Sequence, residues 1–203
     1  AMAEISTLFV TKLYRAELAD ARTLNADLAR ACRTIAEEDE AGQAWSKAKG
    51  YRGYTSYASL NDLPQRDPSF AALKHELDKH AGAFARALHL DLGRRRLKLD
   101  SIWINVLDPG GAHSGHIHPH SVLSGTYYVD VPAGASALKL EDPRLPMMMA
   151  APARREDAPE GERTFVYMTP KAGELLMWES FVRHEVPANA ARKPRISVSF
   201  NYS

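Results

Sequence analysis

The sequence predicts a mostly β protein, a sandwich or barrel, with a helical layer on one side. Two observations carry this prediction. From Leu97 onward, apolar residues recur at every second position in short segments separated by Pro- and Gly-containing turns, which is typical of antiparallel strands. Before Leu97, two segments carry apolar residues at the spacing of an amphipathic helix. About seven short strands after two helices favour a sandwich or barrel over a parallel α/β sheet.

The helical half is expected to span residues 1–95 and to buttress a β-rich core over residues 96–203, within one structural domain. Its first helix is expected over residues 20–38, where one apolar stripe contains Leu24, Leu28, Ala31, Cys32 and Ile35. The cysteine on that stripe is interpreted as a buried structural thiol rather than a catalytic one.

A second helix has a clear start signal. Asp67 can cap it, Pro68 suits its first position, and Gly93 is expected to end it. Residues 44–66 are rich in Gly, Tyr and Ser without periodicity, so we expect irregular structure there. Residues 8–10 are expected to form a short strand or an anchoring segment.

The second half is expected to form strands at residues 97–107, 124–131, 136–142, 164–168, 173–179, 183–188 and 195–202. In the last strand the apolar side chains share one face and the polar ones, Arg195, Ser197 and Ser199, share the other. An arginine and a serine that look inward together can bind a carboxylate by charge-assisted hydrogen bonds. For Arg195 the alternative is an ordinary surface ion pair.

Half of the eight histidines lie within one short stretch, at His113, His116, His118 and His120. On an extended backbone His116 and His118 project from the same face, so their imidazoles can converge on one ion. Neutral imidazole is a ligand suited to iron, zinc, copper and nickel. The alternative interpretation is a polar loop that happens to be rich in histidine.

Composition excludes several classes of protein. The 203 residues carry a net charge of +1, which gives no bulk electrostatic case for binding nucleic acid or a membrane surface. The single cysteine rules out an internal disulfide and fits a reducing cytoplasm. The sequence has neither an apolar run near the ~20 residues of a transmembrane helix nor a signal peptide at its start, so we expect a cytoplasmic protein.

The order of these motifs resembles the 2-oxoglutarate- and Fe(II)-dependent oxygenases. A His-x-His pair is followed by a remote histidine, His184, and then by Arg195-x-Ser197 eleven residues later. More narrowly, the chain from about Trp103 resembles a bacterial and phage subfamily through its HxHP, LSGxYYV, DPR and RISxSFN segments. The resemblance implies a double-stranded β-helix, a cupin-like jelly roll, with Fe(II), 2-oxoglutarate and O2 as cofactor and co-substrates.

The resemblance further implies that His116, His118 and His184 hold the metal. Most members have Asp or Glu where this chain has His118, so the ligand set changes from two histidines and a carboxylate to three histidines. The summed charge of the three ligands therefore changes from −1 to zero. This change affects which metal is native and which type of oxidation is expected. Asp108 is the nearest upstream carboxylate that could replace a ligand.

For the co-substrate, the resemblance implies that Arg195 pairs with the distal carboxylate of 2-oxoglutarate, assisted by Ser197. Tyr128 is expected to reach the co-substrate, with Tyr127 on the other strand face. Asn105 is expected to contact it as well; the alternative is an asparagine that bonds a neighbouring turn. No catalytic residue beyond the metal ligands is implied.

Other residues are expected around the site. His113 and His120 are expected to line its mouth or support the ligands, with a direct ligand role as the alternative. Arg144 is expected at the mouth, where it could meet an acidic group of the substrate. Residues 143–163 form a long connection with three successive methionines, interpreted as a lid, a partner surface or a dimer contact.

Three functions are therefore open from the sequence. The first is a 2-oxoglutarate- and Fe(II)-dependent dioxygenase with an unidentified small-molecule or peptide substrate. The second is a cupin-like three-histidine metalloenzyme without 2-oxoglutarate, which does not need Arg195 and Ser197 on the inner face. The third is a non-catalytic metal-binding module with a closed coordination sphere. We expect neither a membrane nor a nucleic-acid partner. We expect the protein to form a homodimer.

Overall fold

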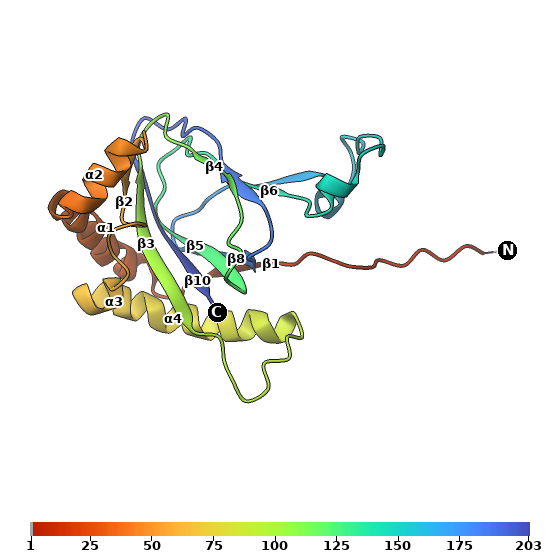
Figure 1. Cartoon of the computed structure of the whole chain (residues 1–203), viewed down its shortest axis with the longest axis horizontal. Coiled ribbons are helices and arrows are strands. Elements are labelled where there is room, and N and C mark those ends of the chain that lie inside the picture. The colour runs from red at the N-terminus through yellow and green to blue at the C-terminus, as the bar shows by residue number, and fades with distance from the viewer. Residues whose placement is uncertain (1) are drawn as a thin grey trace.

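The computed structural model describes residues 2–203 as two antiparallel sheets, with helices over the outer face of the larger one (Figure 1). In spatial order the larger sheet contains β1 (Leu13–Glu17), β8 (Glu174–Glu179), β5 (Leu123–Asp130), β10 (Arg195–Tyr202), β3 (Leu99–Leu107) and β2 (Gly53–Thr55). The smaller contains β4 (His113–His116), β9 (His184–Val186), β6 (Leu138–Glu141) and β7 (Phe165–Met168). The mostly β jelly roll expected from the sequence is confirmed.

The two faces of the larger sheet have different chemistry. On β10, Ile196, Val198 and Phe200 are buried in the core between this sheet and the helices. Arg195, Ser197 and Ser199 face the smaller sheet and line a cleft between the two sheets. The strict alternation of β10 thus separates an apolar helix-packing face from a polar face available for a site.

Helices α1 (Ala21–Glu38) and α4 (Pro68–Ala87) supply the outer layer. Helix α1 buries Cys32 as expected, and burial raises the pKa of this thiol to about 12. At α4 the side chain of Asp67 accepts from the Ser69 N–H at 2.8 Å, which confirms the cap. The expected end at Gly93 is wrong, because the chain leaves the helix after Ala87, where His89 adopts a left-handed φ of 56°.

The expectation of irregular structure over residues 44–66 is also wrong. This segment contains most of α2 (Glu40–Ala48), strand β2 and the short helix α3 (Leu63–Arg66). Helix α2 begins at Asp39, whose carboxylate accepts from the Gly42 N–H at 3.0 Å and from the Tyr54 hydroxyl at 2.8 Å. One partner of this carboxylate lies in the first turn of α2 and the other lies after the helix, in β2. Tertiary contacts thus stabilise a helix that periodicity alone does not reveal.

The strand expected at residues 8–10 is wrong too. These residues are exposed, with 91% of Phe9 accessible, and the chain bends at Phe9, where φ is 56°. The first strand begins at Leu13. Strand β4 was not expected as a strand; it pairs with β9 through His113 and His116. The pairing of β4 with β9 positions the metal-binding histidines described below.

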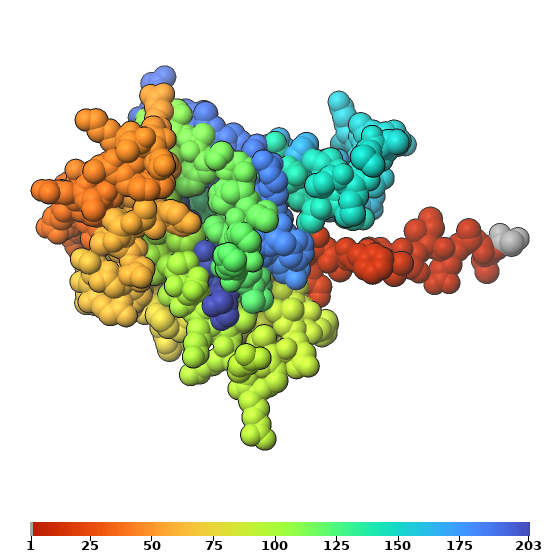
Figure 2. Space-filling view, viewed as in Figure 1, coloured from red at the N-terminus to blue at the C-terminus, as the bar shows by residue number. Residues whose placement is uncertain are grey.

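The connection over residues 143–163 contains two short 3-10 turns, η1 (Leu145–Met147) and η2 (Glu160–Glu162), and projects from the body of the molecule (cyan in Figure 2). Met147 and Met149 are exposed on it. The homodimer and the cytoplasmic location stay predictions. Within residues 2–203, the helices are all too short or too polar to span a bilayer.

Candidate metal centre and co-substrate cleft

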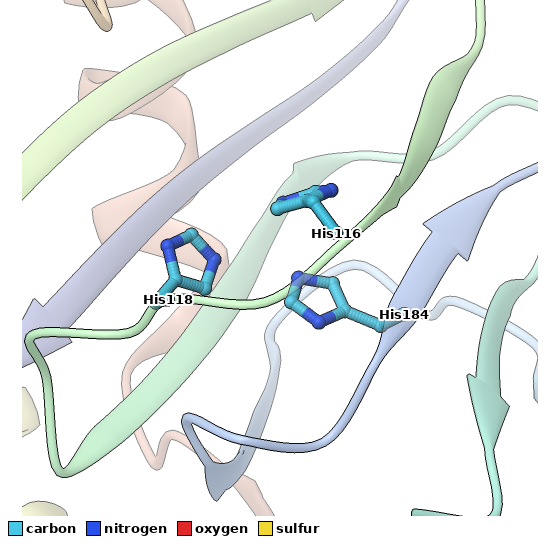
Figure 3. Close-up of side chains that lie close together, drawn as sticks. All are labelled: His116, His118 and His184. Carbon is cyan, nitrogen blue, oxygen red and sulfur yellow. The ribbon is translucent and has the colours of Figure 1, made fainter. Parts of the chain in front are cut away.

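Three histidines converge where β4 and β9 meet (Figure 3). His116 ends β4 and His184 begins β9, and the two residues are direct partners in the antiparallel pair. His118 follows two residues after His116, so its side chain returns to the same side of the chain. One nitrogen from each ring lies within 4.8 Å of the other two, which is close enough for all three to reach one ion.

Backbone carbonyls orient two of the three rings. Nδ1 of His116 lies 2.7 Å from the carbonyl oxygen of Ser114, and Nδ1 of His184 lies 2.9 Å from that of Val182. A carbonyl only accepts, so each Nδ1 carries the proton and each Nε2 keeps its lone pair. This is the usual way in which a ligating histidine is held in one tautomer.

The third ring has a side-chain neighbour instead. The amide nitrogen of Asn201 lies 3.4 Å from Nδ1 of His118, and the same amide contacts the hydroxyls of Ser101 and Ser124. Hydroxyl groups can donate or accept, so the amide can turn and keep both serine partners. Once turned, its oxygen accepts from an Nδ1–H of His118 and leaves Nε2 free for a metal.

Burial keeps two of the ligands, His118 and His184, neutral. Desolvation and repulsion from His116 lower the pKa of His118 to about 4. Desolvation and repulsion from the neighbouring histidines lower the pKa of His184 to about 3. Neutral imidazole is the form that binds metal. Three neutral nitrogen donors at this spacing fit a first-row transition metal such as iron, nickel or zinc. Among residues 2–203 this is the one such cluster found, and Asp108 is not part of it.

The metal-binding histidines lie on the wall of a cleft of about 830 Å³ between the sheets. Its floor is the polar face of the larger sheet, and the segment from α2 to β2 forms one rim. Sites for small molecules typically have volumes of about 300–1,000 Å³, so this cleft is large enough for a co-substrate and a second compound.

Arg195 lies in this cleft and is only 2% exposed. Its Nη1 donates to the Ser136 carbonyl oxygen at 3.1 Å, whereas its Nε has no partner among the described residues. Burial lowers the pKa of this guanidinium, and no carboxylate lies within ion-pair distance in the described part of the chain. A buried cation with an unused N–H beside a cleft is arranged to bind an anion. The surface ion pair considered from the sequence does not describe Arg195.

The other residues expected at the co-substrate also line the cleft. Tyr128 and Ser197 are buried there, whereas Tyr127 points to the opposite face, where its hydroxyl donates to Asn25 of α1 at 2.7 Å. Asn105 accepts from the Thr55 hydroxyl and donates to that of Ser199, both at 3.0 Å. Its amide is thus held by two neighbours while it faces the cleft.

The residues expected at the mouth divide into two groups. His113 lines the cleft, and its Nε2 lies 2.8 Å from the Tyr51 hydroxyl. His120 is exposed in a turn and is not among the lining residues. Arg144 is also outside the cleft, because both ends of its guanidinium bind the carboxylate of its neighbour Asp142, at 3.0 and 2.8 Å.

Several cleft residues were not found from the sequence. Tyr51 lies in the segment that was expected to be irregular, and it is partly buried next to His113. Burial together with repulsion from Arg195 lowers the pKa of that histidine to about 3. Trp178 lines the cleft with a buried indole N–H that has no partner among the described residues. The concentration of Gly and Tyr over residues 50–57 was the available signal for Tyr51.

A jelly roll that holds three histidines and a buried arginine in one cleft defines a mononuclear metalloenzyme that binds an acidic small molecule. The sequence comparisons identify the family. The family described as "Putative 2OG-Fe(II) oxygenase" matches residues 101–201, which include the three histidines, Arg195 and all other residues expected at the co-substrate. Residues 101–201 therefore belong to the 2OG-Fe(II) oxygenase family. A comparison with curated protein sequences finds no match.

Solved structures share the fold at low sequence identity. A prolyl-4-hydroxylase from Pseudomonas putida is 16% identical, with a TM-score of 0.58 over 95% of this chain and 92% of that one. A non-heme alpha-ketoglutarate-dependent carbocyclase from nogalamycin biosynthesis is 15% identical, with a TM-score of 0.65 over 95% and 79%. HygX from Streptomyces hygroscopicus, solved with nickel and 2-oxoglutarate, is 14% identical, with a TM-score of 0.61 over 96% and 83%.

Proposed function

We propose that this protein is a 2-oxoglutarate- and Fe(II)-dependent dioxygenase that oxidises a small-molecule or peptide substrate and converts 2-oxoglutarate to succinate and CO2. The observation that carries the proposal is the buried Arg195, which lines the cleft that also contains the three histidines and whose Nε has no partner among the described residues. Bound iron and 2-oxoglutarate supply the oxygen-activating chemistry, as they do throughout the family.

In this proposal the chain itself binds and orients. His116, His118 and His184 hold the metal, and Arg195 with Ser197 binds the distal carboxylate of 2-oxoglutarate. Tyr128 and Asn105 complete the inner wall and fix the co-substrate's orientation. Because these side chains are buried, they exclude bulk water from the co-substrate and strengthen its charge-assisted hydrogen bonds.

The three-histidine set makes the metal's identity part of the proposal. A neutral ligand set leaves the full charge of a divalent ion to be balanced by bound 2-oxoglutarate, so we expect metal and co-substrate to bind cooperatively. In wild-type protein, 2-oxoglutarate should tighten Fe(II) binding, measured as the metal retained after dialysis. Equal retention with and without 2-oxoglutarate would show that the metal site and Arg195 are not coupled.

The proposed function is tested by anaerobic titration of the Fe(II)-loaded protein with 2-oxoglutarate, followed through the visible charge-transfer band of the chelate. The band should appear in wild type and disappear in Arg195→Ala and His184→Ala. Arg192→Ala and His75→Ala are matched controls, because both side chains are exposed and away from the cleft. Full metal occupancy without a band in wild type would instead support the cupin-like enzyme or the metal-binding module.

A further inference from the structure

Three aromatic side chains form a continuous wall on one side of the cleft. Trp45 of α2, Tyr57 after β2 and Trp103 of β3 make up this aromatic wall. The ring centroids of Trp45 and Tyr57 are 6.3 Å apart, and those of Tyr57 and Trp103 are 5.3 Å apart in an edge-to-face arrangement. Trp103 then lies 6.0 Å from His118. The wall therefore leads from the rim of the cleft to a metal-binding histidine.

The aromatic wall lies outside the two clusters of buried apolar residues, although Trp103 itself is buried. All three side chains line the cleft, and none belongs to either cluster of buried apolar residues. Tyr57 is 57% exposed although it contacts two tryptophans. Large aromatic side chains gathered at an accessible cleft indicate a binding surface rather than packing.

The wall lies away from the arginine that is proposed to bind 2-oxoglutarate. In the β3–β10 pair, Trp103 is opposite Ser199 and Leu107 is opposite Arg195. Trp103 and Leu107 are four residues apart on β3, so these two positions are separated by roughly 13 Å along the strand. A co-substrate held at Arg195 therefore leaves the aromatic wall open to a second compound.

Charge at the wall favours an acidic compound. Lys49 follows Trp45 by one helical turn, lines the same rim, is exposed, and makes no ion pair within the described residues. Among the described residues that line the cleft, Glu185 is the one acidic side chain, and Lys139 binds it at 2.8 Å. The rim thus offers a free cation and no free carboxylate.

We propose that the aromatic wall and Lys49 form the substrate subsite, and that this subsite takes a compound with a planar ring and an acidic group. The ring lies against Tyr57 and Trp103, next to His118, and the acid points to Lys49. The inference rests on the proposed oxygenase function for calling the ligand a substrate. The binding itself requires only the wall and the lysine, and it is tested separately.

The test uses full-length protein loaded with Zn(II), which binds histidines without turnover, and saturated with 2-oxoglutarate so that Arg195 is occupied. The probe is 3-phenylpropionate, and its dissociation constant is measured by ligand-observed NMR. It should bind at least about threefold more tightly than 3-phenylpropionamide and 3-phenylpropylammonium. Butyrate, an acid without a ring, should not bind. Equal or tighter binding of the cation would overturn the proposal.

Variants locate the probe. Tyr57→Ala and Trp45→Ala should weaken binding about tenfold, whereas Lys49→Ala should abolish the preference for acid over amide. Tyr167→Ala and Lys47→Ala remove an exposed tyrosine and an exposed lysine outside the cleft and should change nothing. Unchanged affinity in Tyr57→Ala and Trp45→Ala would place the probe elsewhere and overturn the proposal. Tyr57 and Lys49 are exposed, so these variants are expected to fold.

Two further comparisons complete the test. Acetyl-glycyl-phenylalanine presents the same ring and acid on a peptide, so it distinguishes a peptide substrate from a free acid. The compound whose affinity falls more in Tyr57→Ala, the peptide or 3-phenylpropionate, represents the class of substrate that the subsite binds. The probe is also titrated without 2-oxoglutarate. If 2-oxoglutarate fails to bind but the probe still depends on Tyr57 and Lys49, the co-substrate assignment fails and the subsite stands.

Discussion

At the scale of single residues, Arg195 links the fold to the proposed chemistry. Its position on the polar face of β10 follows from the alternation of that strand, but its burial does not follow from the sequence. The β-rich half brings Ser136 and Tyr128 around it, with the guanidinium carbon 5.6 Å from the Tyr128 ring centre. The protein therefore supplies hydrogen-bond partners for only some of the N–H groups of this guanidinium, and the others can donate to an anion.

Arg195→Lys tests whether geometry or charge alone holds the co-substrate. Lysine keeps the charge but cannot make the planar two-pronged contact of a guanidinium. Loss of one charge-assisted hydrogen bond, about 1.5–3 kcal/mol, predicts a weakening of 2-oxoglutarate binding by roughly 10- to 100-fold. The measurement is calorimetric titration of the Zn(II)-loaded variant. Arg192→Lys is the control, and an unchanged affinity in Arg195→Lys would contradict the proposed contact.

Single residues also show how far the sequence was informative about the site. Alternation on an extended chain places His116 and His118 on one side, as the sequence predicts. The pairing of β4 with β9 brings His184 to them, and Arg195 of β10 lines the same cleft. Arg144 was misplaced, since its sequence neighbour Asp142 binds its guanidinium, an interaction that a motif does not reveal. The wall residues Trp45 and Tyr57 were missed because they come from the other half of the chain and meet Trp103 only in the tertiary structure.

At the scale of secondary-structure elements, α2 depends on the carboxylate of Asp39. This side chain caps the helix and accepts hydrogen bonds from Tyr54 and Ser59, which follow the helix in the chain. Periodicity over nine residues is weak, so the sequence could predict the longer helices α1 and α4 but not α2. Since α2 carries Trp45 and Lys49, its cap also fixes one edge of the proposed substrate subsite.

Asp39→Ala should lower the free energy of unfolding by about 1–3 kcal/mol at pH 7, from the lost cap and hydrogen bonds to a charged group. Burial tends to raise the pKa of Asp39, but hydrogen bonds from Ser59, the Gly42 N–H and Tyr54 outweigh it and lower this pKa below its usual value. The contribution is therefore present above the unfolded-state pKa of about 4 and is lost as the pH falls below it.

Urea unfolding of wild type and Asp39→Ala at pH 7 and pH 3 measures this effect. The difference between the two proteins should shrink at the lower pH. Asp20→Ala is the matched control, because Asp20 precedes α1 without making a capping hydrogen bond. A difference of the same size at both pH values would mean that the ionised form of Asp39 is not what stabilises α2.

Strand β5 pairs with β8 and β10 at Gly125, where there is no room for a side chain. A Cβ atom there would lie 2.5 Å from the Leu176 carbonyl oxygen and 2.5 Å from the Phe200 ring. Gly125→Ala should therefore destabilise the fold by about 1–3 kcal/mol, as overpacking usually does. Gly161→Ala is the control, since nothing lies within 4 Å of its Cβ position. Equal melting temperatures of the two variants would show that β5 and β10 can separate at no cost.

At the scale of the whole molecule, the fold class was predictable because apolar alternation marks the strands of the second half other than β4. What the sequence could not supply was how the halves combine. Strands β1 and β2 from the first half join the edges of the larger sheet, and the cleft is closed on one side by the segment from α2 to β2. These contacts are between residues far apart in sequence, and no local pattern encodes them.

The metal centre also acts at this scale, because its ligands join two strands of the smaller sheet that are distant along the chain. A metal that binds only the folded protein should stabilise it by about 2.7 kcal/mol at a free concentration 100 times the dissociation constant. Zn(II) or Ni(II) should therefore raise the melting temperature of wild type. His184→Gln should remove this shift, whereas His75→Ala, at an exposed position on α4, should retain it.

The same histidines predict how the metal-free protein responds to pH. Burial lowers the folded-state pKa of His118 to about 4 and that of His184 to about 3, below the unfolded value of about 6.5. As the pH falls, these histidines therefore take up protons in the unfolded chain before they do so in the folded protein. The free energy of unfolding is unaffected above a pH of about 6.5 and decreases as the pH falls toward the folded-state pKa values.

Melting temperatures of the metal-free protein should consequently fall between pH 7 and pH 5, a range in which most carboxylates stay ionised. His184→Gln removes one of these groups and should show a shallower fall, with His75→Ala following wild type. Because the folded imidazoles stay neutral, metal added at pH 5 should still bind and offset part of the loss. A variant profile that coincides with that of wild type would mean that the buried histidines do not set the acid limit of this fold.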